Sequence, residues 1–147
     1  MRHRRLRNVA SSGGEAFVDT GAWIALALAR DPLHDRARSV WTAQEAAGTR
    51  WVTSVPVLIE TFTFLSRSVS TQVALTWKDK LGEIHRLRLL ECTARDLQDS
   101  WIWFARGDLH RLSAVDATSF TLMRKEGLKR AFAFDTHFGI AGFDYLG

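Results

Sequence analysis

The chain has little of several residues that support whole classes of protein. Its 147 residues include one cysteine, Cys92, two prolines and one tyrosine. A single cysteine excludes an internal disulfide and is typical of a protein from a reducing compartment, so we expect a cytoplasmic location. No apolar run reaches the ~18 residues of a membrane helix. The segment AWIALALA is short and is closed by Arg30 and Asp31, and the basic start lacks the apolar core of a secretory signal.

The sequence also lacks the motifs of several common enzyme classes. There is no glycine-rich phosphate loop followed by Lys-Ser or Lys-Thr, and no G-x-S-x-G nucleophile turn. The histidines do not have zinc-ligand spacing and do not suggest a pair for metal-independent RNA cleavage; they are His3, His34, His85, His110 and His137. These absences argue against nucleotide hydrolases with a phosphate loop, serine hydrolases and zinc proteins.

Positive charge is concentrated at the start of the chain. The formal net charge is +4, and the first fourteen residues, MRHRRLRNVASSGG, hold four arginines and no acid. The remaining sixteen basic residues balance the sixteen acidic ones. We therefore expect a disordered basic tail over residues 1–14, with at most weak affinity for phosphate backbones, and one neutral folded domain over residues 15–147.

Short apolar segments alternate with longer helical patterns through residues 15–147. We expect strands over 15–20, 50–54, 87–92, 131–134 and near FDYL, and helices over 21–31, 32–48, 54–68, 71–85, 93–106 and 113–127. Ser54 and Thr93 are expected helix caps, and Gly48 and Gly127 expected helix ends. This alternation predicts an α/β fold in which a short parallel sheet has helices on both faces, giving three layers.

Four acidic residues fall where a parallel sheet forms its sites. Asp19 and Asp135 end strands, Asp116 lies in the first turn of a late helix, and Glu60 lies in the helix after the second strand, between apolar neighbours. Each has a simpler interpretation. Asp19 and Asp135 could cap the segments that follow, Glu60 could reach solvent, and Asp116 could complete a capping box as Asp96 does in Thr93-Ala-Arg-Asp96. Together, the simple interpretations require four coincidences.

Other polar and aromatic residues near these acids are weaker candidates. Arg106 and Arg111 precede Asp116 in a loop and are candidates for phosphate contact. His137 could touch substrate, although packing or solvent exposure is the commoner role for such a residue. The aromatic run WIWF, residues 101–104, could stack bases, but a helix that is apolar on several sides is more often buried or at a subunit interface.

Three segments together resemble the PIN domain, and most of all its small stand-alone toxins of the VapC type. These segments are AFVDTGAWIALALARDPLH, WVTSVPVLIETFTFL and LSAVDATSFTLMRKEGLKRAFAFDTHFGIAGF. The resemblance runs in order over residues 15–147. It implies an acidic active site made of Asp19, Glu60, Asp116 and Asp135, with Thr20 in support. Family members often have serine where Gly21 stands, and some carry a further acid where this chain offers Thr118 and Ser119.

The resemblance implies a Mg²⁺- or Mn²⁺-dependent endoribonuclease. Carboxylates and a phosphodiester are all anionic, so they meet only through cations, and hard divalent ions prefer oxygen ligands. We expect Asp19 and Asp116 to bind metal directly. Asp135 would complete the ligand set or bind through water, and Glu60 would hold the metal-bound water or assist in its deprotonation. The resemblance also implies RNA as substrate, a cognate antitoxin and a homodimer. A non-catalytic PIN module that binds RNA or a protein partner is the alternative.

Overall fold

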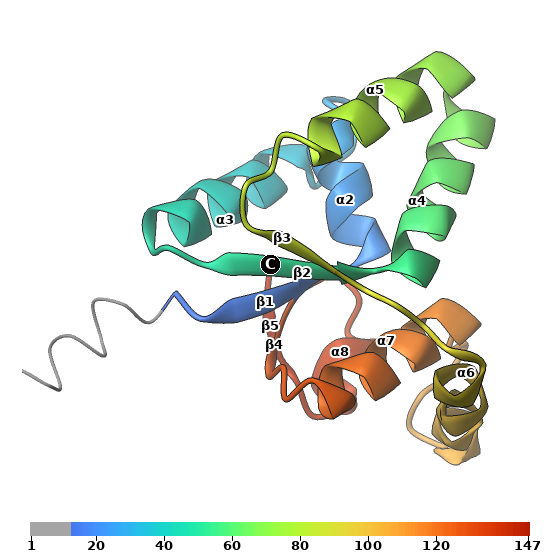
Figure 1. Ribbon diagram of the computed structural model, residues 1–147. Helices are drawn as coiled ribbons and strands as arrows, with labels where there is room; N and C mark the ends of the chain where they lie inside the picture. The colour runs from blue at the N-terminus through green and yellow to red at the C-terminus, as the bar shows by residue number, and fades with distance from the viewer. Residues whose placement is uncertain (1–12) are drawn as a thin grey trace, which may run out of the picture.

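A computed structural model describes residues 13–147, and its centre is a five-stranded parallel sheet (Figure 1). The strands are β1 (Glu15–Val18), β2 (Arg50–Ser54), β3 (Leu87–Leu90), β4 (Arg130–Phe132) and β5 (Asp144–Leu146). They lie in the order β3-β2-β1-β4-β5, and every neighbouring pair is parallel. Because β1 is central, the residue that follows it lies in the middle of the carboxyl edge of the sheet, where sites form in such folds.

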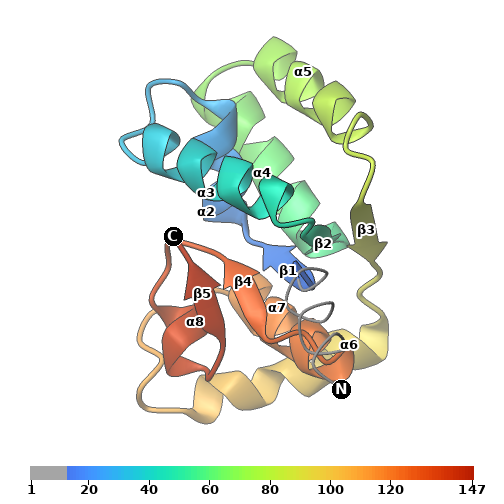
Figure 2. The ribbon, with the colours of Figure 1, turned by 90° about the vertical axis from the view of Figure 1, so that its left-hand side faces the viewer.

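Helices cover both faces of this sheet, as the sequence predicts. One face carries α2 (Thr20–Ala27), α3 (His34–Ala46), α4 (Val55–Ser68) and α5 (Thr71–Leu81). The other carries α6 (Ala94–Ser100), the 3₁₀ segment η1 (Trp101–Ala105), α7 (Ala114–Lys125) and the short α8 (His137–Ile140). The turned view in Figure 2 separates the same two groups of helices on either side of the strands. The predicted three-layer α/β architecture is therefore confirmed.

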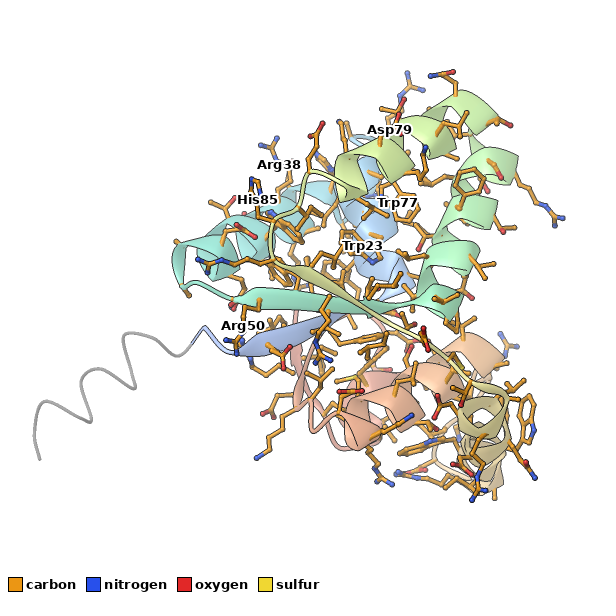
Figure 3. All side chains as sticks on the ribbon, viewed as in Figure 1. Trp23, Arg38, Arg50, Trp77, Asp79 and His85 are labelled. Atoms are coloured by element: carbon orange, nitrogen blue, oxygen red, sulfur yellow. The ribbon has the colours of Figure 1, made fainter. Side chains whose placement is uncertain are left out.

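Fully buried apolar side chains hold the three layers together. Phe17, Val52 and Phe132 come from three adjacent strands and are completely buried, as is Phe120 of α7. Such strands, buried on both faces, account for the nearly continuous apolar runs in the sequence. Four tryptophans are in contact on the face covered by α2, α3 and α5, namely Trp23, Trp41, Trp51 and Trp77. Trp23 and Trp77 meet edge to face with ring centroids 6.2 Å apart (Figure 3).

The ends of three predicted helices are corrected by the structure. The helix expected over 21–31 ends at Ala27, because Leu28 has an extended backbone with φ −111° and ψ 109°. The helix expected over 71–85 ends at Leu81, where the Gly82 N–H bonds to the Asp79 and Lys80 carbonyls and the chain turns toward β3. The helix expected over 93–106 tightens into the 3₁₀ segment η1 after Ser100. Within η1 only Trp103 is buried, and its indole N–H donates to Thr121 Oγ1 at 3.2 Å. The large side chains of Trp101, Ile102 and Phe104 are exposed. Of the two roles expected for this aromatic run, burial within the chain therefore does not apply to them, and a subunit interface stays a prediction.

The two glycines before β1 belong to the packed structure. Gly14 O accepts from the Arg50 N–H at 2.8 Å, and Gly13 O accepts from Thr49 Oγ1 at 3.1 Å. A Cβ on Gly13 would lie 2.4 Å from the backbone of residues 47–49, so this position has no room for a side chain. Residues 1–12, which make up most of the predicted tail, lie outside the described residues. Among residues 13–147, none of the helices has the length and apolar character that a bilayer-spanning segment needs.

Candidate active site

The first acid of the predicted site follows the central strand directly. Asp19 is the N-cap residue of α2, and its amide donates to the Phe132 carbonyl of the neighbouring strand at 3.0 Å. Its carboxylate makes no capping hydrogen bond, and Oδ1 is buried without a partner among the described residues. The interpretation of Asp19 as a mere helix cap therefore lacks the bond that such a cap would make. A buried, unpartnered carboxylate oxygen is costly unless a cation or a proton completes it.

Asp116 and Asp96 each lie three residues after the hydroxyl residue that caps their helix, but their carboxylates have different partners. At α6, Thr93 and Asp96 form a complete capping box, with bonds of 2.9 and 3.1 Å in the two directions. Asp96 also pairs with Lys125 Nζ at 3.1 Å. At α7, Ser113 accepts from the Asp116 N–H at 3.0 Å, but within the described chain the return bond is not formed. The carboxylate of Asp116 instead faces Asp135 and His137.

The pKa values of these two aspartates follow from their surroundings. The Thr93 amide and the Lys125 ammonium outweigh partial desolvation and lower the pKa of Asp96. Burial, followed by the charge and hydrogen bond of Asp135 and the charge of Glu60, raises the pKa of Asp116 to about 7. A carboxyl group whose pKa is close to neutrality is more typical of a catalytic or binding site than of a structural helix cap.

Asp135 lies between β4 and α8 and has both a structural and a possible chemical role. Its Oδ1 accepts from the His137 backbone N–H at 2.9 Å, which is the turn-capping role that the sequence allowed. Both of its carboxylate oxygens also face the His137 ring, with Nδ1 at 3.0 and 3.1 Å. One capping bond leaves lone pairs free on each oxygen, so Asp135 can cap the turn and bind a cation at the same time.

Glu60 joins this group through its charge. It projects from α4, a helix that begins at the Ser54 cap directly after β2, and it is half-buried. The Glu60 charge contributes to the raised pKa values of both Asp19 and Asp116, so the four predicted acids share one electrostatic environment. For Asp19, burial is the largest cause of a pKa well above the usual range, followed by the charge of Asp116.

His137 is more closely tied to the acids than the sequence suggested. Its Nδ1 lies 3.6 Å from Asp116 Oδ2 as well as beside Asp135, and its Nε2 lies 2.5 Å from the His110 carbonyl oxygen. Burial lowers the pKa of His137, but the His110 carbonyl and the two carboxylates outweigh it and raise that pKa above its ordinary value. The sequence signal was present, since the histidine follows Asp135 by two residues, but its spacing matched no metal motif.

The supporting residues divide into buried hydroxyls and loop cations. The Thr20 and Ser119 hydroxyl oxygens are buried and without a partner in the described residues, whereas Thr118 Oγ1 donates to the Val115 carbonyl at 2.7 Å. Arg106 is held by Asp108 in two bonds of 3.0 and 2.6 Å, which is a structural role. Arg111 is exposed and adopts φ of +54°, so it remains the better candidate for a phosphate contact.

A divalent cation fits this arrangement. Asp116, Asp135 and His137 each offer a ligand atom, and these atoms lie within 4.8 Å of one another. Asp19 and Glu60, which the sequence also predicted for this site, lie outside that compact group. The charge of Asp116 nevertheless acts on Asp19, and the buried, unpartnered Oδ1 of Asp19 is a further candidate donor whose desolvation a cation would offset. A separate cavity of about 660 Å³ lies between α2, α3 and α5 and is lined by Trp23, Trp41 and Trp77, but by none of the acids.

Comparisons with known proteins agree with this geometry. The chain matches the PIN domain family over residues 16–143. It is 39% identical over 129 residues to the 23S rRNA-specific endonuclease VapC20 of Mycobacterium tuberculosis, covering 86% of this chain and 94% of that protein, in each of two strains. The crystal structure of VapC20, described as a sarcin–ricin loop cleaving toxin, superposes with a TM-score of 0.77 at 37% identity, covering 87% of this chain and 95% of the other.

The match covers nearly the whole described chain and includes all four acids. It agrees with the predicted fold class and with the resemblance carried by the sequence segments. This chain belongs to the PIN domain family.

Proposed function

We propose that this chain is a metal-dependent endoribonuclease and the toxin of a toxin–antitoxin pair. The observation that carries the proposal is the divergence of Asp116 from Asp96. At the start of α6, the Asp96 carboxylate accepts a hydrogen bond from the helix-capping residue. At the start of α7, the Asp116 carboxylate lies beside other acids and has a pKa of about 7. The family match and the 39% identical endonuclease support the same activity.

Mg²⁺ or Mn²⁺ is the cofactor that this donor set suits. Carboxylate-rich sites with no cysteine favour hard, oxygen-seeking ions. When bound, such an ion neutralises the phosphodiester and the developing charge and activates water for attack. Asp19, Asp116 and Asp135 would hold the ion, and Glu60 would orient the water and accept its proton. Arg111 would bind a neighbouring phosphate, where its planar guanidinium allows two bonds.

The reaction is a direct displacement at phosphorus. Water adds to phosphorus in line with the 3′ oxygen, which leaves, so the products carry a 5′-phosphate and a 3′-hydroxyl. No neighbouring 2′-hydroxyl is needed. A histidine-based ribonuclease would instead use that hydroxyl and leave a 2′,3′-cyclic phosphate.

The experiment is cleavage of purified ribosomal RNA followed by analysis of the product ends. Large-subunit ribosomal RNA is the first substrate to try, because the 39% identical relative is named for cleaving 23S rRNA. We expect fragments with 5′-phosphate ends in Mg²⁺ or Mn²⁺ and no cleavage in EDTA. Cyclic phosphate ends would contradict the mechanism. Intact RNA across ribosomal, transfer and messenger substrates would favour the alternative, a PIN module that binds without cutting.

A protein partner and a dimer are the remaining parts of the proposal. We expect an antitoxin, encoded beside this chain, to place an arginine among the site carboxylates, because a guanidinium pairs with them in two bonds. Adding that partner should abolish cleavage and weaken Mn²⁺ binding together; inhibition with unchanged Mn²⁺ affinity would place the arginine elsewhere. The exposed side chains of Trp101, Ile102 and Phe104 are consistent with a homodimer, which light scattering would detect.

A further inference from the structure

The imidazole ring of His137 is held on both sides by groups of fixed hydrogen-bonding character. Nε2 lies 2.5 Å from the His110 carbonyl oxygen, which can only accept, so Nε2 carries the proton in that bond. Nδ1 points the other way, 3.0 Å from Asp135 Oδ1 and 3.6 Å from Asp116 Oδ2. The side chain is only 16% exposed, so the ring has little freedom to turn away. The ring therefore presents Nδ1, and no other polar atom, to the carboxylates.

The loop that contains His110 is bonded to the helix that carries His137. Arg106 donates to the Asp108 carboxylate in two bonds and to the Ile140 carbonyl at the end of α8 at 3.1 Å. This bridge ties the loop before α7 to α8 across thirty-four positions of sequence. The positive φ of Arg111 then turns the chain directly after His110. Loop and helix thus form one support for the imidazole ring.

This support is of the kind that metal-binding histidines have. A ligating histidine usually donates its second ring N–H to a carbonyl or carboxylate, which sets the tautomer and the ring orientation. The spacing of the donor atoms also suits one ion. Neighbouring ligands of an octahedral Mg²⁺ or Mn²⁺ lie about 3.0 Å apart when the metal–ligand bonds are about 2.1 Å. The separations of 3.0 and 3.6 Å lie close to that value.

We propose that His137 Nδ1 is a direct ligand of the cation held by Asp116 and Asp135, with Arg106 and the His110 carbonyl as positioning groups. The proposal rests on the metal-dependent function above and adds a nitrogen donor to a set otherwise made of oxygens. Imidazole nitrogen is a softer ligand than carboxylate and binds Mn²⁺ in preference to Mg²⁺. His137 therefore makes the site more selective for Mn²⁺ than four carboxylates would be.

Electron spin-echo spectroscopy of the Mn²⁺-loaded full chain tests this directly, because it detects a nitrogen bonded to the ion without any turnover. We expect ¹⁴N modulation from a coordinated imidazole, replaced by the ¹⁵N pattern when the protein is made with ¹⁵N-histidine. That comparison uses only the unaltered sequence, so it does not depend on a variant that folds. Mn²⁺ bound with no nitrogen modulation would overturn the proposal while leaving the proposed function intact, whereas no Mn²⁺ binding at all would overturn both.

Two substitutions identify which histidine is responsible. His137→Gln should remove the nitrogen modulation and lower Mn²⁺ affinity about tenfold or more, with a smaller loss for Mg²⁺. His85→Gln is the matched control, since His85 is exposed in the turn before β3, at the amino end of a parallel strand, whereas Asp19 and Asp135 follow the carboxyl ends of β1 and β4. A signal that persists in His137→Gln would contradict the assignment. A positioning role for Arg106 predicts that Arg106→Gln lowers the Mn²⁺-to-Mg²⁺ affinity ratio in the same direction, and an unchanged ratio would remove Arg106 from the proposal.

Discussion

At the scale of single residues, the site brings together carboxylates that repel one another. Four carboxylates near the carboxyl edge of the sheet raise the pKa values of Asp19 and Asp116, and burial is the largest cause for both. His137 offsets part of this charge, since its raised pKa favours the imidazolium form when no metal is bound. Without a cation, the folded protein therefore binds protons here that the unfolded chain would release.

This charge arrangement predicts how the stability of the metal-free protein depends on pH. Asp116 titrates near pH 3.8 when unfolded and near 7 when folded, so its contribution falls as pH rises through that interval. The His137 contribution is also lost as pH rises past its raised folded pKa. We expect the melting temperature in EDTA to fall from pH 5 to pH 8, and to fall less in Asp116→Asn. Saturating Mn²⁺ should raise the melting temperature more at pH 8 than at pH 5.

The pattern of acids could be predicted from the sequence, but the pairing of each carboxylate could not. Strand ends and helix starts place Asp19, Asp116 and Asp135 at one edge, which follows from the geometry of parallel sheets. Whether an acid in a capping position turns back to its helix depends on neighbours far along the chain. Lys125, twenty-nine residues after Asp96, holds that carboxylate at α6. The contact between His137 and the His110 carbonyl joins two loops and has no local signature.

At the scale of elements, the N-terminal approach to β1 depends on a close backbone contact. Gly13 lies against the turn between α3 and β2, and its carbonyl accepts from Thr49 and Arg130 side chains. Gly13→Ala should lower stability by about 1–3 kcal/mol, because a Cβ would overlap backbone atoms at 2.4 Å that cannot move aside singly. Urea denaturation measures the loss.

Gly107→Ala is the comparison for that substitution. A Cβ at Gly107 meets nothing within 4 Å, and the residue lies in an exposed loop, so we expect a change of at most about 0.5 kcal/mol. Equal stability losses in the two variants would contradict the account of Gly13.

The elements themselves were predictable where local signals and tertiary packing agree. The bounds of β2, residues 50–54, and the Ser54 cap of α4 match the expectation because an apolar strand meets a serine and a first-turn proline there. α5 stops four residues earlier than expected because pairing of β3 with β2 requires the chain to leave the helix at Gly82. Helix propensity alone does not predict this helix end, because it takes no account of the pairing between β3 and β2.

At the scale of the whole molecule, we propose that the basic segment before Gly13 is dispensable for folding. Among the described residues, the apolar core is built from side chains between residues 16 and 146, and residues 1–14 lack apolar periodicity. A protein that begins at Gly13 should keep the melting temperature and helical circular dichroism of the full chain. A clear drop in either would show that residues before Gly13 contribute to the folded domain. If the shortened protein differs from the full chain only in binding RNA more weakly at low salt, the basic segment contributes to RNA binding and not to folding.

The central claim is that the carboxylates at the edge of the sheet bind metal and cleave RNA. Its most direct test measures Mn²⁺ affinity and ribosomal RNA cleavage in Asp116→Asn and Asp96→Asn, which alter the same position of the same helix-start pattern. Asp96→Asn should cost about 1 kcal/mol of stability, through the capping box and Lys125, and keep cleavage. Asp116→Asn should fold, melt in EDTA at or above the wild-type temperature, and lose both Mn²⁺ binding and cleavage. Wild-type cleavage and Mn²⁺ affinity in Asp116→Asn would contradict the account.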